Sequence, residues 1–102
     1  MGQYIKVAKK SELPENCGTC VEVEGRRIAL FHVDGEIHAL DDLCTHEQAP
    51  LSDGEIEDGE IECPWHGATF NLKTGACTGP PADEDLARYN VRVVGDDVEV
   101  EL

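Results

Sequence analysis

At 102 residues the chain has the length of a single domain, and no hydrophobic run approaches the roughly 20 residues of a membrane-spanning helix. Its 22 acidic residues outnumber the 8 lysines and arginines and give a net charge of −14, which argues against nucleic acid and anionic membranes as partners. This charge favours a basic docking partner, with general solubility or adaptation to high salt as the alternative explanation.

The N-terminal segment, residues 1–18, has no apolar core of the kind that signal peptides carry, so we expect a cytoplasmic protein. The five cysteines are too few, and odd in number, for a framework of disulfides.

Alternation of apolar and polar residues predicts short strands, and no segment has ten or more residues of helical periodicity. The predicted strands are Tyr4–Ala8, Val21–Glu24, Arg27–Val33, Glu36–Leu40, Thr69–Leu72, Arg88–Val94 and Val98–Leu102. Asp34-Gly35 is a favoured type I′ hairpin turn, and the resulting register places His38 opposite Phe31 and His32 opposite Ile37. The chain is therefore predicted to be all-β, with both histidines as sheet residues.

A C-x-x-C pattern, Cys17 to Cys20, precedes the strand Val21–Glu24. A redox pair of the thioredoxin type should begin a helix, and no second C-x-x-C completes a zinc site. We interpret Cys17 and Cys20 as thiols without an assigned role, as we do Cys77, with a reversible disulfide or a second metal as the alternative for the C-x-x-C pair.

Two short pairs of potential metal ligands organise the middle of the chain. Cys44 and His46 form a C-x-H pair, Cys63 and His66 form a C-x-x-H pair, and 16 residues lie between the pairs. Zinc accepts two cysteines and two histidines, but its usual pairs are C-x₂₋₄-C and H-x₃₋₅-H. A [2Fe–2S] cluster with two cysteines on one iron and two histidines on the other fits both mixed pairs. A zinc-stabilised binding module, which would be colourless, is the alternative.

At these residues the sequence resembles the Rieske family, whose pattern is C-x-H, a gap of similar length, and then C-x-x-H. The similarity continues through Leu51–Gly54 between the two cluster loops and through Gly67 after the second histidine. Gly79–Ala82 is similar to the proline loop of the family.

The resemblance implies the Rieske iron–sulfur fold, an antiparallel β-sandwich, over residues 1–102, with a small cluster-binding subdomain at about residues 43–82. It also assigns the ligands of one [2Fe–2S] cluster per chain. The ligands are Cys44 and Cys63 on one iron and His46 and His66 on the other.

High-potential members of the family carry a disulfide between the cluster loops and two hydroxyl donors after the second histidine. Here the cysteine positions are Ala49 and Trp65, and the hydroxyl positions are Ala68 and Phe70. Fewer donors stabilise the reduced state less, so we expect a reduction potential near the low end of the Rieske range, about −150 mV.

The resemblance implies a soluble, monomeric one-electron carrier. The sequence also suggests no catalytic acid–base pair, so we do not expect an enzyme. Such a ferredoxin takes electrons from a flavin-dependent, NAD(P)H-oxidising reductase and passes them to a terminal oxygenase, most often an aromatic-ring dioxygenase. A monooxygenase ferredoxin or the small subunit of a nitrite reductase is the alternative, although the four ligands argue against the latter.

Six carboxylates lie between Asp53 and Glu62, on a predicted hairpin whose turn is Glu57–Glu60. They form either part of a docking face or simply a solvated hairpin.

Overall fold

The computed structural model describes residues 3–42, 50–65, 67–79 and 85–101, and strands dominate it. The strands are β1 (Tyr4–Lys9), β2 (Cys17–Val23), β3 (Arg26–Val33), β4 (Glu36–Asp41), β5 (Glu55–Glu57), β6 (Glu60–Glu62), β7 (Thr69–Asn71), β8 (Cys77–Gly79), β9 (Arg88–Tyr89), β10 (Val91–Val94) and β11 (Asp97–Glu101). Two 3₁₀ turns, η1 (Lys10–Glu12) and η2 (Leu51–Asp53), are the only helical elements of these residues. The all-β prediction is confirmed, and no described helix is long and apolar enough to cross a membrane.

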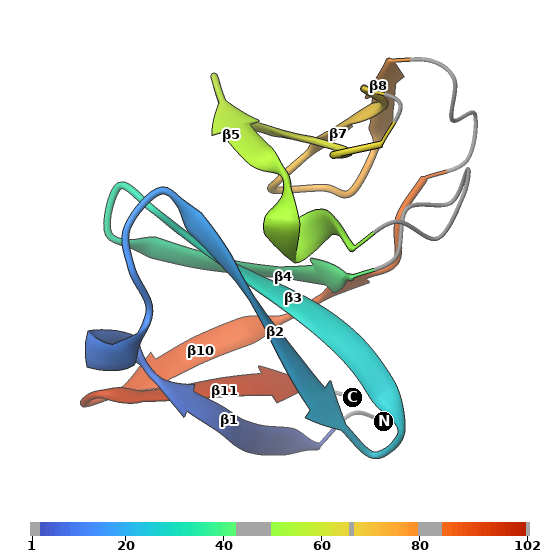
Figure 1. The fold of residues 1–102 in the computed structure, drawn as a ribbon. Coiled ribbons are helices and arrows are strands. Elements are labelled where there is room, and N and C mark those ends of the chain that lie inside the picture. The colour runs from blue at the N-terminus through green and yellow to red at the C-terminus, as the bar shows by residue number, and fades with distance from the viewer. Residues whose placement is uncertain (1–2, 43–49, 66, 80–84, 102) are drawn as a thin grey trace.

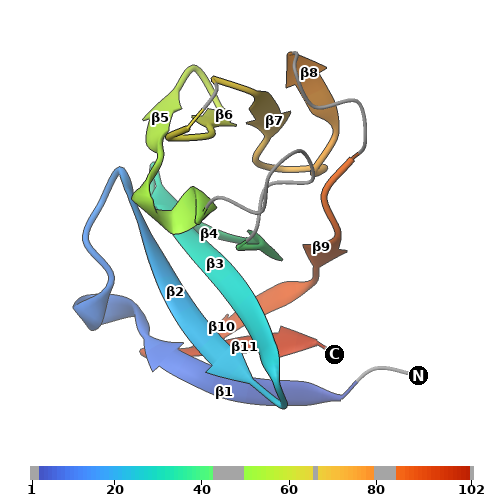
Figure 2. The ribbon, with the colours of Figure 1, turned by 45° about the vertical axis from the view of Figure 1, so that its right-hand side comes forward.

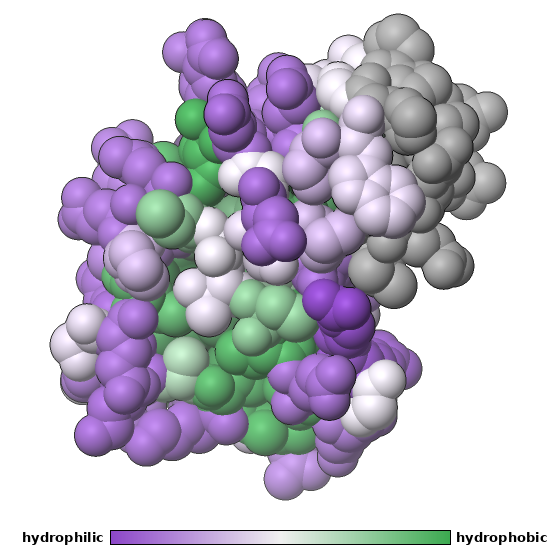
Figure 3. All heavy atoms as spheres, viewed as in Figure 1, coloured by the Kyte–Doolittle hydropathy of each residue, from purple (hydrophilic) through white to green (hydrophobic). Residues whose placement is uncertain are grey.

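The strands form three antiparallel sheets in three layers. The central sheet has the order β2-β3-β4-β9, the outer sheet β1-β11-β10 and the small sheet β5-β6-β7-β8. Figures 1 and 2 both place the small sheet at the top, the central sheet in the middle and the outer sheet at the bottom. Hydrophilic side chains cover much of the face seen in Figure 3.

The middle of β3 is buried on both faces of the central sheet. Ile28 and Leu30 belong to the core shared with the outer sheet, whereas Ala29 and Phe31 belong to the core shared with the small sheet. All four are at most 1% exposed. Successive side chains of a strand point to opposite faces, so an uninterrupted apolar run fits a strand that is covered on both sides.

The hairpin between β3 and β4 has the predicted geometry. Asp34 and Gly35 both have positive φ, at 52° and 78°, as a type I′ turn requires. The register places Phe31 opposite His38 and His32 opposite Ile37, which confirms the prediction.

The single strand predicted for Arg88–Val94 is wrong, because the chain changes sheets within it. Tyr89 pairs with β4 in the central sheet, and Val91 pairs with β11 in the outer sheet. Between them, the Asn90 carbonyl accepts a hydrogen bond from the Glu101 N–H at 2.9 Å, and its side-chain amide donates to Glu101 Oε1 at 2.8 Å. These bonds hold the crossing point, which alternation of residues does not reveal.

β2 begins at Cys17, four residues before the predicted strand, because its pairing with β3 extends to His32. Glycine at position 18 lets the turn η2 approach this extension closely. A Cβ atom at Gly18 would lie 2.7 Å from the Ser52 carbonyl oxygen and 2.8 Å from Ser52 Cα.

Replacing Gly18 with alanine should lower the free energy of unfolding by about 1–3 kcal/mol, because the new methyl group would press on backbone that cannot simply rotate away. Chemical denaturation measures this change. The exposed neighbour gives a matched control, and Cys17→Ala should change stability by less than about 0.5 kcal/mol. A Gly18→Ala protein as stable as wild type would contradict the close approach of η2.

Candidate metal centre

Cys63 is the one predicted ligand that lies within the described residues, since Cys44, His46 and His66 fall outside them. Its side chain directly follows β6, is 2% exposed and belongs to the apolar core beneath the small sheet. Phe70 from β7 belongs to the same core. The position suits a metal ligand that is shielded from water.

The backbone around Cys63 forms a tight loop that returns to β7. The Cys63 N–H donates to the Ala68 carbonyl at 2.7 Å, and the Gly67 N–H donates to the Cys63 carbonyl at 3.2 Å. Gly67 has a φ of 78°, a conformation that glycine adopts without steric cost. These bonds hold Cys63 and Ala68 close together, and His66 lies between these two residues in the sequence.

The donor set and the burial of Cys63 both suit an iron–sulfur cluster. Two thiols and two imidazoles in mixed pairs match the ligands of a Rieske centre, and the described thiol is shielded from solvent. Ala68 and Phe70 are fully buried in the core that contains Cys63, so apolar groups occupy both positions where high-potential relatives carry hydroxyls. This arrangement supports the expectation of a low potential.

Trp65 is 58% exposed, although it lies two residues from the buried Cys63. Its indole therefore offers a large apolar surface to solvent near the proposed ligands. Aromatic side chains of this kind are enriched at protein–protein interfaces.

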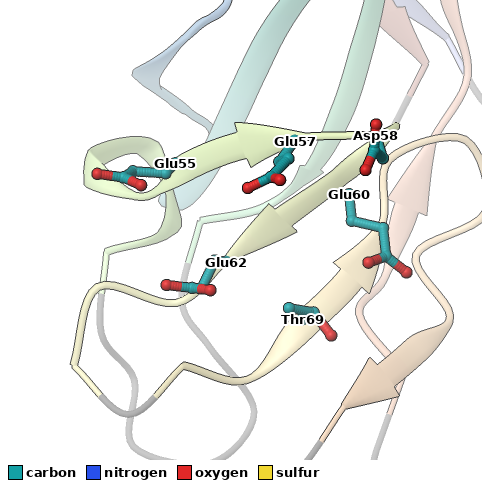
Figure 4. Close-up of a pocket in the computed structure, with 6 residues that line it drawn as sticks. All are labelled: Glu55, Glu57, Asp58, Glu60, Glu62 and Thr69. Carbon is teal, nitrogen blue, oxygen red and sulfur yellow. The ribbon is translucent and has the colours of Figure 1, made fainter.

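The β5–β6 hairpin carries carboxylates on one face and isoleucines on the other. Glu55 lies opposite Glu62, and Glu57 lies opposite Glu60, so like charges face each other across the strands. A pocket of about 200 Å³ lies on this face. It is lined by Glu55, Glu57, Asp58, Glu60, Glu62 and Thr69 (Figure 4). Like-charged cross-strand pairs destabilise a sheet, so this face concentrates negative charge at a cost in stability.

His32 and His38 lie in the central sheet with local partners, as predicted. The His32 ring is buried and donates from Nδ1 to the Leu13 carbonyl at 2.8 Å. His38 Nε2 lies 3.9 Å from Glu36 Oε1.

Cys17 and Cys20 do not form a local redox pair. Both lie on β2, where residues three apart point to opposite faces and their Cα atoms are separated by about 10 Å. Disulfides require Cα atoms closer than about 7 Å. Burial raises the pKa of the Cys20 thiol, which therefore stays protonated at neutral pH. Within the described parts of the chain, no group of three or more His, Cys, Asp or Glu residues is placed to hold a metal ion.

Sequence reasoning assigned no role to Asp42, which is fully buried immediately before the predicted first cluster loop. Its carboxylate lies 2.8 Å from the guanidinium of Arg27. An acidic residue directly after a buried strand could have indicated a buried charge. Nothing in the local sequence, however, indicates that Arg27 is its partner.

Comparisons with known proteins converge on one family. The family profile described as the Rieske [2Fe-2S] domain matches residues 3–90. The chain is 40% identical over 100 residues to the ferredoxin component of the naphthalene 1,2-dioxygenase system of Pseudomonas aeruginosa, covering 98% of this chain and 96% of that protein.

Two solved structures share the fold over nearly the whole chain. The ferredoxin of carbazole 1,9a-dioxygenase from Nocardioides aromaticivorans IC177 superposes with a TM-score of 0.92 at 30% identity, covering 96% of each chain. A structure described as a complex of reduced oxygenase and oxidised ferredoxin in carbazole 1,9a-dioxygenase matches with a TM-score of 0.88 at 33% identity, covering 95% of this chain and 91% of that chain.

The environment of His38 predicts an acid-side loss of stability. Burial lowers the pKa of His38, so the unfolded chain binds more protons than the folded chain as the pH falls below about 6.5. The free energy of unfolding should therefore decrease from about pH 7 to pH 5, and His38→Gln should reduce this decrease. Urea denaturation across this pH range measures the free energy of unfolding of the wild type and of His38→Gln.

Glu36 supplies the control for this prediction. Its charge opposes the effect of burial on the pKa of His38, so Glu36→Gln should steepen the pH dependence. An identical pH dependence in the wild type and His38→Gln would show that His38 does not contribute.

Proposed function

The chain belongs to the Rieske [2Fe-2S] domain family, and we propose that it carries single electrons from an NAD(P)H-dependent flavoprotein reductase to a terminal oxygenase of the aromatic-ring dioxygenase type. The 40% identity to a dioxygenase ferredoxin component over almost the entire chain carries this proposal. Like the ferredoxin components that it resembles, the protein is an electron carrier and not itself an oxygenase.

In this proposal Cys44 and Cys63 bind one iron, and His46 and His66 bind the other. The Rieske [2Fe–2S] cluster supplies reversible one-electron chemistry when it is bound. Cys63 presents its sulfur from within an apolar core, and the fully buried Ala68 and Phe70 exclude water from its surroundings.

The architecture and location follow from the same assignment. We propose that residues 1–102 form one domain, that about residues 43–82 form its cluster-binding subdomain, and that the protein is a cytoplasmic monomer.

The acidic surface supports docking on a basic partner. The net charge is −14, and the carboxylates of the β5–β6 hairpin share one face although their mutual repulsion destabilises it. The exposed Trp65 adds an apolar contact near the proposed ligands. The complex of oxygenase and ferredoxin in carbazole 1,9a-dioxygenase provides a precedent for the proposed oxygenase partner.

Purified protein reduced with dithionite should give a rhombic EPR signal whose mean g value lies below that of all-cysteine clusters. Analysis of the same sample should find two irons and two sulfides per chain. The reduction potential should be about −150 mV, because alanine and phenylalanine occupy the hydroxyl positions. A colourless, EPR-silent protein that contains zinc would contradict electron transfer and favour a zinc-stabilised module.

Replacing His66 with cysteine tests the proposed ligand set. A thiolate in place of a neutral imidazole adds negative charge, so the variant should have a lower potential or fail to assemble the cluster. His38→Cys is the matched control, and it should retain the EPR signal because His38 lies in the central sheet. An unchanged signal in His66→Cys would remove His66 from the ligands.

Electron transfer to a basic acceptor should depend on the carboxylates of the hairpin. With cytochrome c as acceptor, the double variant Glu57→Gln/Glu60→Gln should be about two- to fivefold slower at low salt and equal to wild type at high salt. The variant should also be more stable by about 0.2–1 kcal/mol, because one like-charged pair is removed.

Glu22→Gln/Glu24→Gln is the matched control, since it removes the same charge at the end of β2 and in the turn that follows. This turn lies at the bottom of Figures 1 and 2, whereas the small sheet lies at the top. If the two double variants react equally slowly, net charge and not the hairpin determines the rate.

A further inference from the structure

We propose that Asp42 is a positioning residue that, together with Arg27, clamps the two ends of the first cluster loop. The loop connects Asp42 to Leu51 and carries two of the proposed ligands, Cys44 and His46, so the inference rests on the proposed function. The clamp fixes where the chain leaves the central sheet and where it returns to the core.

Asp42 bonds directly to residues on the far side of the loop. Its carbonyl oxygen accepts a hydrogen bond from the Leu51 N–H at 2.5 Å, and its Oδ1 accepts one from the Ser52 N–H at 2.8 Å. The main chain and the side chain of one residue therefore bind two successive amides, which fixes both the distance between the loop ends and their register.

Arg27 ties the same residue to the central sheet. The Asp42 N–H donates to the Arg27 carbonyl at 3.1 Å, and Arg27 Nη2 donates to Asp42 Oδ2 at 2.8 Å. Each carboxylate oxygen thus has its own donor. The clamp is anchored on β3, whose middle is buried on both faces.

The far end of the loop is also held by packing. Leu51 is fully buried in the core that contains Cys63, so its position is linked to the second cluster loop. Ser52 lies against Gly18 of β2, where no side chain separates the two backbones. A shift of η2 would therefore disturb the spacing between the two pairs of proposed ligands.

The burial of Asp42 makes the clamp sensitive to the loss of either partner. Its side chain is fully buried, whereas that of Arg27 is 46% exposed. A buried carboxylate is tolerated only when it is paired and hydrogen-bonded. Removing Arg27 would leave Asp42 Oδ2 without its donor, and removing the Asp42 carboxylate would leave the Ser52 N–H without its acceptor. Among the described residues, no buried side-chain nitrogen or oxygen lacks a hydrogen-bond partner.

The rate at which iron is released from the oxidised protein tests the clamp. Release into a chelator is monitored by visible absorbance, at a temperature below that of unfolding. Asp42→Ala and Arg27→Gln should each release iron at least about tenfold faster than wild type. Asp42→Asn should be intermediate, because its amide oxygen still accepts from Ser52, and Arg27→Lys should partly restore retention. If Asp42→Ala does not fold, Asp42→Asn and Arg27→Gln carry the test.

Arg92 and Glu99 provide the matched control. Their side chains pair at 2.6 Å in the outer sheet, away from the small sheet (Figure 1). Arg92→Gln should release iron within about twofold of wild type, because the Arg92 side chain is more than half exposed and its pair lies in the outer sheet. Equal release rates in Arg92→Gln and Arg27→Gln would overturn the proposal.

The reduction potential separates positioning from charge. Loss of the negative charge of Asp42 should raise the potential and loss of the positive charge of Arg27 should lower it, whereas both losses should speed iron release. Release rates that follow the opposite signs of the charges would favour a purely electrostatic effect and overturn the clamp.

Hydrogen exchange tests the clamp by a measurement that does not depend on the cluster. The amide protons of Leu51 and Ser52 should exchange slowly in the wild type, and that of Ser52 should exchange faster in Asp42→Ala or, if that variant does not fold, in Asp42→Asn. If the wild type holds no cluster, the proposed function fails. Rapid exchange of both amides in the wild type would instead overturn the clamp itself.

Discussion

The burial of β3 on both faces is the constraint on which the rest of this structure depends. Its alternate side chains pack against the outer sheet on one side and against the small sheet on the other. Fully burying a side chain such as Phe31 or Ile28 contributes about 1.5–3 kcal/mol. The small sheet has strands of only three residues, and it gains its core from β3 and β4. The buried Cys63 therefore depends on a strand that contains none of the proposed ligands.

The small sheet combines this apolar support with an unfavourable polar face. Ile56 and Ile61 lie opposite each other, and Ile61 is fully buried, whereas the neighbouring glutamates face their own like charges. The burial of the isoleucines on one face offsets the repulsion between the glutamates on the other. A partner with basic groups on its surface would relieve that repulsion on binding, so the repulsion in the free protein would favour complex formation.

Much of the fold was predictable because strands leave a local pattern. The apolar run of β3 and the Asp34-Gly35 turn determined the β3–β4 hairpin and its register. The family and its cofactor followed from the resemblance at the two mixed ligand pairs, and the comparisons confirm both. The assignment of the four ligands stays a prediction, since three of them lie outside the described residues. The change of sheets at Asn90 and the pairing of Asp42 with Arg27 were not predictable, because both depend on contacts between distant residues.

The pairing of β1 with β11 brings the two ends of the described chain together. Tyr4 lies opposite Glu101, in the outer sheet at the bottom of Figure 1, while the small sheet lies at the top. A second protein linked at either end would therefore approach from the side opposite Cys63 and the acidic hairpin. The fold is thus suited to being tethered, to a surface or to another protein, with the acidic hairpin and the exposed Trp65 left accessible.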